Sequence, residues 1–252
     1  MQPSIAPSQF YTGIVAECYA ALRGVDPDPE PYARFIASAG EPALELGCGD
    51  GDPLLALRAR GLDVAGLDSS ADMIARARRR AEDLGIEVVL HCAAIEAMDL
   101  GRQYQSMFLA GPTFNLIVDD VIVQQALNNI ARHLVDGGRV LIPLFVPSPL
   151  PTEVIGKWRS RDASDGTLMR FMVVDEAFDA VSRSQNSTLR YEVTRDGTTT
   201  SEDREWLIHW HTQAGFRAMI EAAGLRVDSV IDEAGNSATA DARSLVFIAR
   251  KP

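Results

Sequence analysis

The sequence predicts an α/β protein built on a parallel sheet with helices on both faces. Between residues 43 and 145, apolar runs of strand length alternate with amphipathic segments of helix length. These runs are continuous rather than half-polar, which is typical of strands buried on both faces of a parallel sheet. The alternation ends at residues 143–151, because four prolines in nine residues cannot continue a central strand or a helix.

The elements of this first part follow from composition and breakers. Two helices are expected before the sheet, at 8–23 and 30–39, separated by a turn at 24–29 that holds one glycine and two prolines. The alternating elements are then strand 43–47, helix 53–60, strand 63–68, helix 70–84, strand 87–92, strand 106–110, helix 119–134 and strand 139–145.

A different pattern follows the proline-rich segment. Residues 168–174, 188–195 and 198–211 are predicted strands, and the turn Asp196-Gly197 joins the last two as a hairpin. We therefore expect an antiparallel insertion that lies over the ligand-binding end of the sheet. The remaining elements are a helix at 213–223, ended by Gly224, and strands near 226–233 and 244–250.

Composition excludes several classes of function. The chain has 252 residues and a formal net charge of −11, which argues against a nucleic-acid backbone as partner. Its three cysteines and four histidines show no metal-ligand spacing, so no metal is expected, and reduced cysteines fit a cytoplasmic location. No apolar segment is long enough to span a membrane. The basic run Arg76–Arg80 is interpreted as a solvated helix face.

The turn from Glu45 to Gly51 is the most informative motif. Its glycines at alternate positions let the backbone turn sharply and approach a ligand closely. Glu45, Asp50 and Asp52 place three carboxylates around it, which disfavours a pyrophosphate and favours a cationic ligand. Asp68, at the end of the second strand, is placed to accept ribose hydroxyls, with Ser69 as the expected cap of the next helix. An adenosine with a cationic tail describes S-adenosylmethionine.

At this motif the sequence resembles the class I S-adenosylmethionine-dependent methyltransferases, over residues 40–146 and more weakly over 213–250. The resemblance implies a Rossmann-like, doubly wound sheet of seven strands, mostly parallel with one antiparallel C-terminal strand. It also implies four parts: a helical cap (1–40), a cofactor-binding core (41–147), the β insertion as substrate lid or oligomerisation element (148–212) and the C-terminal part of the core (213–252).

The cofactor site is expected where the carboxyl ends of the strands converge. Residues 94–96 match the family's third motif only in part, since Ala93 and Ala94 stand where an aspartate often meets the adenine. The residues expected to bind the cofactor are Tyr11, Glu45, Gly47, Cys48, Gly49, Asp68, Ser69, Met73, Ala94, Ile95, Glu96, Leu109, Ala110 and Gly111.

Three aromatic residues are the expected catalytic side chains. Tyr11 and Tyr19 are eight positions apart, near one face of the predicted first helix, and Phe114 lies in the turn after a core strand. Methyl transfer is an in-line displacement, for which rings can exclude water and attract a cation. The Phe10-Tyr11 pair and the turn 109–114 are also similar to those of lincosamide and amino-sugar N-methyltransferases of antibiotic biosynthesis.

The acceptor is predicted to be an amine of a small, natural-product-like molecule. The sequence offers no clear general base; His91 is interpreted as a strand residue, while His209 or His211 could take a proton from an alcohol. O-methylation therefore stays open, as do an NAD-dependent oxidoreductase and a non-catalytic S-adenosylmethionine-binding regulator. The tryptophan-rich insertion also predicts homo-oligomers formed through its edges.

Overall fold

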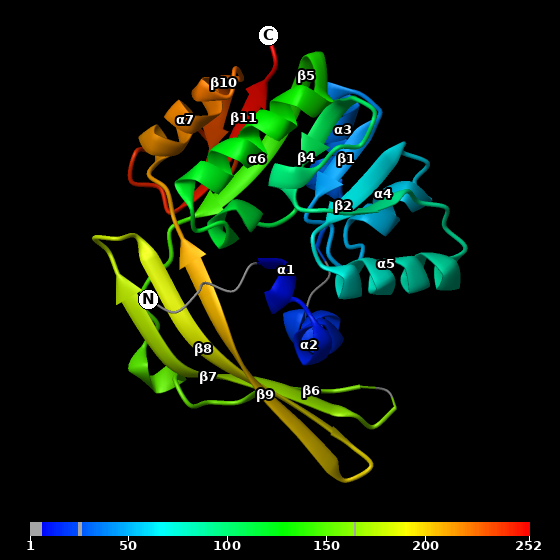
Figure 1. Ribbon diagram of the computed structural model, residues 1–252, viewed down its shortest axis with the longest axis vertical. Coiled ribbons are helices and arrows are strands. Elements are labelled where there is room, and N and C mark those ends of the chain that lie inside the picture. Colours follow the sequence, from blue (N-terminus) through cyan, green and yellow to red (C-terminus); the bar gives the residue numbers. More distant parts are fainter. Residues whose placement is uncertain (1–6, 25–26, 164) are drawn as a thin grey trace.

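A computed structural model of the protein describes residues 7–24, 27–163 and 165–252. It contains two separate sheets, one of seven strands and one of four (Figure 1). The large sheet has the order β10-β11-β5-β4-β1-β2-β3, and the five strands from β5 to β3 in this order pair in parallel. The strands of this sheet are β1 (Ala43–Leu46), β2 (Val64–Asp68), β3 (Leu90–Cys92), β4 (Tyr104–Phe108), β5 (Leu134–Phe145), β10 (Arg226–Ile231) and β11 (Ser244–Arg250).

The antiparallel C-terminal strand is confirmed. Strand β11 runs antiparallel to both β5 and β10, so the sheet is mostly parallel with one reversed strand. Strand β4 lies two residues earlier than predicted, which leaves Leu109, Ala110 and Gly111 beyond its carboxyl end. Strand β5 begins at Leu134, earlier than the predicted 139, because β4 pairs with Leu134 as well as with residues 139–141.

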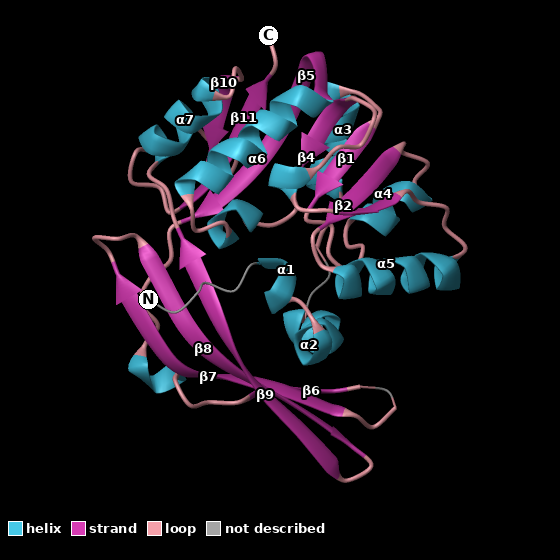
Figure 2. Ribbon diagram, in the orientation of Figure 1, coloured by secondary structure: helices cyan, strands magenta, loops and turns pink. Residues whose placement is uncertain are grey.

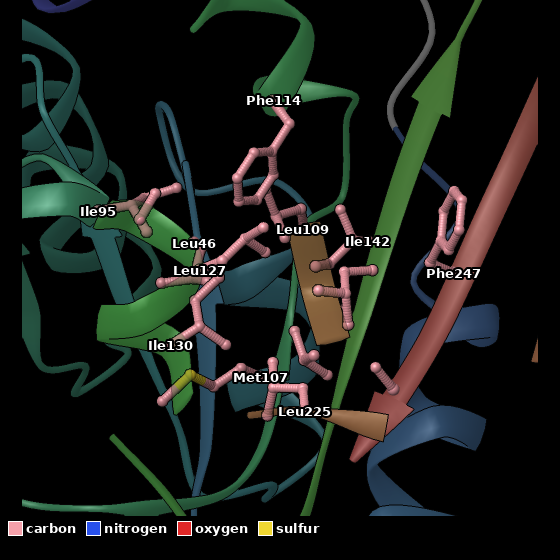
Figure 3. Packing of buried hydrophobic residues seen from close by; sticks show 14 of the residues in the cluster. Leu46, Ile95, Met107, Leu109, Phe114, Leu127, Ile130, Ile142, Leu225 and Phe247 are labelled. Atoms are coloured by element: carbon pink, nitrogen blue, oxygen red, sulfur yellow. The ribbon is translucent and has the colours of Figure 1, made fainter. Parts of the chain in front are cut away.

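Helices cover both faces of the large sheet (Figure 2). On one face, α6 and α7 bury an apolar cluster with the sheet, part of which is drawn in Figure 3. On the other face, α3, α4 and α5 bury a second cluster around Phe35, Leu54 and Ile74. These helices are α3 (Glu30–Ala39), α4 (Leu54–Ala59), α5 (Ala71–Leu84), α6 (Asp120–His133) and α7 (Gln213–Ala222).

The four-stranded antiparallel sheet is inserted between β5 and α7, at the end of the large sheet where β5 finishes (Figure 1). Its strands are β6 (Arg159–Asp162), β7 (Leu168–Asp179), β8 (Ser184–Arg195) and β9 (Thr198–His209). The three predicted strands are present, β7 and β8 being longer than expected, and β6 is additional. A role of this sheet as a lid or as an oligomerisation element stays a prediction.

The predicted first helix is two helices. Helix α1 (Pro7–Phe10) ends before Tyr11, and α2 (Gly13–Arg23) begins two residues later at a glycine with φ of 52°. Both helices pack on the four-stranded sheet through a third apolar cluster that includes Phe10, Val15 and Tyr191. Helices α1 and α2 are therefore seated between the two sheets (Figure 1). No helix in the described ranges has the length and apolar character needed to cross a membrane.

Candidate active site

The glycine turn leaves β1 and is fixed against the end of β2. The amides of Gly47 and Cys48 both donate to the carbonyl of Leu67, at 2.7 and 3.0 Å. Gly47 and Gly49 have φ values of 71° and 53°, in the left-handed region that favours glycine. A Cβ atom on Gly47 would lie only 2.8 Å from the hydroxyl oxygen of Thr113, so the turn also approaches the segment after β4.

Asp68 joins the turn to the start of α5. Its Oδ2 accepts the amide of Gly49 at 2.9 Å, and its Oδ1 accepts the amide of Ser70 at 2.8 Å. Burial raises the pKa of this carboxyl, while the two amide hydrogen bonds act in the opposite direction. We expected Ser69 to cap α5, but the cap is Ser70, whose Oγ accepts a hydrogen bond from the amide of Met73 at 3.2 Å. The helix begins one residue later than predicted, which moves the cap.

The negative charge of the turn is balanced, contrary to expectation. Arg23 lies 2.7 Å from Asp52 Oδ2 and 3.7 Å from Asp50 Oδ1, and Arg80 lies 2.8 Å and 3.1 Å from the same two side chains. The interpretation of the basic run on α5 as a solvated face is therefore wrong for Arg80. Because arginines neutralise them, Asp50 and Asp52 offer less negative charge with which to select a cationic ligand.

Glu45 is the exception among these acids. Its side chain is fully buried, and neither carboxyl oxygen has a hydrogen-bond partner among the described residues. Burial raises its pKa well above the ordinary value, the neighbouring Asp52 and Asp68 carboxylates raise it further, and the backbone of Leu54 opposes this rise without a well-aligned hydrogen bond. A buried carboxyl without a partner beneath a glycine turn is typical of a functional site rather than of a folding core.

Tyr11 and Tyr19 meet above this turn, although they do not share one helix as predicted. Tyr11 lies in the break between α1 and α2, and its ring contacts that of Tyr19 edge to face, with centroids 5.6 Å apart. A Cβ atom on Gly49 would lie 3.9 Å from the Tyr19 hydroxyl and 3.4 Å from Cε of Met73. Tyr19 and Met73 are thus brought to the glycine turn, and their contacts with the cofactor stay predictions.

The third catalytic candidate lies elsewhere. Phe114 is fully buried and packs edge to face on Phe216, at 5.4 Å, within the cluster of Figure 3. The ring expected to be catalytic is thus packed within the core in this structure, and a catalytic role of Phe114 stays a prediction. Residues 113–116 form a short 3-10 helix, η2 (Thr113–Leu116), which directs Phe114 into the core. The neighbouring Asn115 donates to the carbonyls of Phe145 and His209, at 2.9 and 3.0 Å.

The remaining cofactor candidates divide between backbone and core. Ile95, in the 3-10 turn η1 (Ile95–Ala97), and Leu109 are buried in the first apolar cluster, so only their main chains can face a ligand. Ala110 accepts a hydrogen bond from the hydroxyl of Tyr32 at 3.0 Å, which the sequence did not reveal. No described residue lies within 4 Å of a Cβ built on Gly111, so the turn after β4 has open space there. No observation tests the proposed contacts of Cys48, Ala94 and Glu96 with the cofactor.

A second polar group lies where β9 returns to the core. His209 and His211 point toward one carboxylate, that of Asp120 at the start of α6. Burial is the main cause of a lowered pKa at both histidines, which reaches about 4 at His211. The sequence placed the two histidines on one face of a strand, but nothing in it linked them to Asp120.

The turn fits an adenosyl methyl donor. Each oxygen of Asp68 accepts one amide, and a carboxylate oxygen can accept two hydrogen bonds, so Asp68 retains capacity for hydroxyl donors. Gly47 and Gly49 form a cradle that side chains would fill, and the orphaned carboxyl of Glu45 lies beneath it. When bound, S-adenosylmethionine would supply an electrophilic methyl group, and Tyr19, Gly49, Asp68 and Met73 are the residues that would hold it.

Comparison with known proteins agrees with this geometry. Residues 43–138 match a family described as a methyltransferase domain. An N,N-dimethyltransferase of Streptomyces fradiae that acts on dTDP-3-amino-3,6-dideoxy-α-D-glucopyranose is 29% identical over 56% of this chain and 57% of its own length. The Streptomyces venezuelae enzyme acting on dTDP-3-amino-3,4,6-trideoxy-α-D-glucopyranose is 26% identical over 73% of this chain and 75% of its own length.

The fold is shared with solved methyltransferases. The CcbJ methyltransferase of Streptomyces caelestis superposes with a TM-score of 0.73 at 21% identity, covering 96% of this chain and 98% of that one. Its similarity therefore extends over the cap and the inserted sheet as well as the core. The match over residues 43–138 identifies a methyltransferase domain in the core of this chain, and together with the common architecture it supports a class I S-adenosylmethionine-dependent methyltransferase.

Proposed function

We propose that the protein transfers the methyl group of S-adenosylmethionine to an amine nitrogen of a small acceptor of the amino-sugar type. The observation that carries this proposal is the meeting of Tyr11 and Tyr19 over the glycine turn, with ring centroids 5.6 Å apart. Two tyrosine rings at that position provide a face that attracts a cation, by ~0.5–2 kcal/mol per ring. They also displace water from the place where the nucleophile must approach.

The two tyrosines support positioning rather than proton transfer. Burial raises the pKa of both hydroxyls, so each stays protonated throughout the neutral range. A protonated phenol can donate a hydrogen bond but cannot accept the proton of an alcohol. A neutral amine carries its own lone pair and needs only alignment opposite the sulfur, which favours nitrogen over oxygen as the acceptor atom.

The two amino-sugar N,N-dimethyltransferases that resemble this chain support the same acceptor class. Both act on a sugar nitrogen, as their names state. A natural-product setting, such as antibiotic biosynthesis, belongs to the same proposal. Self-association through the four-stranded sheet is a separate prediction that analytical ultracentrifugation can test.

Matched acceptors provide the decisive experiment. The enzyme and S-adenosylmethionine are incubated with 3-amino-3,6-dideoxyglucose or with 6-deoxyglucose, each free and linked to dTDP, and products are followed by mass spectrometry. A gain of one or two methyl groups on the amines alone is the expected result. Methylation of the alcohols alone would refute the proposal and support O-methylation.

Donor binding without turnover is the other outcome that contradicts the proposal. Calorimetry with S-adenosylmethionine and with its demethylated product reports donor binding independently of any acceptor. Heat with the donor, combined with no product from any amine in a wider panel, would support a non-catalytic regulator instead. Reactions without enzyme and with heat-denatured enzyme serve as the controls for background methylation in the assay.

A further inference from the structure

Three side chains with metal-binding atoms meet at the junction between the inserted sheet and the core. Oδ1 of Asp120 lies 3.7 Å from Nε2 of His209 and 3.8 Å from Nδ1 of His211. One ligand atom from each residue lies within 4.8 Å of the other two. His209 ends β9, His211 follows it, and Asp120 is the first residue of α6, so the group joins two elements far apart in the sequence.

Each of the two imidazoles leaves one buried ring nitrogen without a partner: in His209 this is the nitrogen that faces Asp120, whereas in His211 the nitrogen that faces Asp120 is Nδ1 and the unpaired one is Nε2. The His211 side chain is 4% exposed and that of His209 is 12% exposed. Nε2 of each ring has no hydrogen-bond partner among the described residues. A buried nitrogen left unpaired is costly, by roughly 1–3 kcal/mol, and is uncommon unless a ligand or ion completes it.

The position of the group is fixed by the backbone. The side chain of Asn115 connects His209 to Phe145. Its Nδ2 donates to the backbone carbonyls of both residues, and its Oδ1 accepts the amide of Phe145 at 3.2 Å. The rings of His209 and His211 pack edge to face at 4.9 Å, and His211 also contacts Phe216. The two histidines are therefore held in place, while the exposed Asp120 carboxylate is free to adjust.

We infer that Asp120, His209 and His211 form a binding site for a divalent transition metal, best suited to Zn²⁺. Two imidazoles and one carboxylate are a ligand set that zinc uses with a fourth, open position. Zinc bonds of about 2.0–2.2 Å place tetrahedral ligand atoms about 3.3 Å apart, so each histidine nitrogen must approach Asp120 Oδ1 by a few tenths of an ångström. Rotation of Asp120 shortens these two distances, while the two histidine ligand atoms, which lie within 4.8 Å of each other, approach by rotation of their rings.

The bound ion would tie the inserted sheet to the core. Two ligands belong to the end of β9 and the third to α6, and η2 beside them belongs to the segment that approaches the glycine turn. Arg183 is a nearby cation that acts on both histidines and opposes the ion, whereas Asp120 favours it. None of the three ligands belongs to the glycine turn, so the metal site is separate from the proposed donor site.

Titration with Co²⁺ tests the site directly. The full chain, purified without a histidine tag, is titrated with Co²⁺ in the absence of donor and acceptor, and the visible d–d absorption is recorded. One equivalent with a tetrahedral spectrum is expected, together with its displacement by one equivalent of Zn²⁺. Zn²⁺ should also raise the melting temperature of the protein.

Variants decide whether these residues are the ligands. Asp120→Asn should preserve folding because the side chain is exposed. The variant loses the charged carboxylate ligand, so its affinity for Co²⁺ should fall by more than about tenfold. His211→Asn should abolish the spectrum, with circular dichroism confirming its fold. His91→Gln removes an imidazole far from the group and should leave the titration unchanged. The inference is overturned if the wild-type chain shows no d–d band, or if Asp120→Asn and His91→Gln titrate alike.

Discussion

The hydroxyl of Ser70 donates a hydrogen bond of 2.6 Å to the backbone carbonyl of Tyr11, which ties the first turn of α5 to the break between α1 and α2. The same turn makes a second attachment, because Asp72 Oδ2 accepts the amide of Gly13 at 2.7 Å. Ser70 is also the cap of α5 and the neighbour of Asp68. Ser70, which follows the end of β2, thus also positions Tyr11, the tyrosine proposed to wall the site.

Ser70→Ala should therefore affect stability and donor binding together. Loss of the cap costs about 1 kcal/mol, which lowers the melting temperature by roughly 2–4 °C in a chain of this size. Loss of the bond to Tyr11 should raise the KM for S-adenosylmethionine more than it lowers kcat. Ser160→Ala, at an exposed serine of β6, is the matched control, and equal effects of the two variants on KM would show that Ser70 does not position Tyr11.

Substitutions of the two tyrosines separate the ring from the hydroxyl. Tyr19→Ala and Tyr11→Ala remove a ring face and should lower kcat/KM by about 2-fold to 30-fold each, the equivalent of ~0.5–2 kcal/mol. Tyr19→Phe and Tyr11→Phe keep the ring and should retain most of the activity. If the phenylalanine variants lose as much activity as the alanine variants, the hydroxyls carry the function and the proposed role of the rings is wrong.

Much of the fold could be predicted because it follows local patterns. The parallel strands and their helices differ from the expected bounds by a few residues, since apolar periodicity is a local property of the chain. Strand β6, with the sequence Arg-Ser-Arg-Asp, was missed because all four residues are exposed and only pairing with β7 makes them a strand. The break at Tyr11 was missed because Gly13 is the only glycine or proline between residues 8 and 23, and a single glycine can also lie within a helix.

The site was predictable where the chemistry lies in consecutive residues. The glycine turn and Asp68 are brought together as expected, by hydrogen bonds between adjacent strands. The partners of the acidic turn, Arg23 and Arg80, come from two different helices, so no spacing rule could associate them. The inward direction of Phe114 depends likewise on a 3-10 turn that the sequence does not mark.

The paired acids of the turn give a third prediction. Arg80→Gln leaves the buried Asp50 with less compensation and should destabilise the fold by about 1–3 kcal/mol, less than a fully buried pair because Arg80 is partly exposed. Arg79→Gln, which alters the exposed neighbour, should change stability by less than about 0.5 kcal/mol. Urea unfolding measures both, and similar midpoints for the two variants would exclude a structural role of the Arg80 pairs.

The unpaired carboxyl of Glu45 gives a fourth prediction, on the dependence of stability on pH. Its pKa in the folded chain lies well above the value of 4.5 that it has when exposed. Between these two values the folded chain holds a proton that the unfolded chain releases, so stability falls as the pH rises through this window. The cost is fully present above the folded pKa and is absent below the unfolded one.

Glu45→Gln replaces this carboxyl with a neutral group of the same shape and removes the cost. The variant should match the wild type near pH 4.5 and become the more stable protein as the pH approaches 8, by about 1.4 kcal/mol for each tenfold change in proton affinity caused by burial. Chemical unfolding at a series of pH values measures this difference, with the exposed Glu82→Gln as control. If the carboxyl contacts the donor, calorimetry should show that Glu45→Gln binds S-adenosylmethionine more weakly than the wild type. A gain in stability with unchanged donor affinity would instead assign Glu45 to the fold alone.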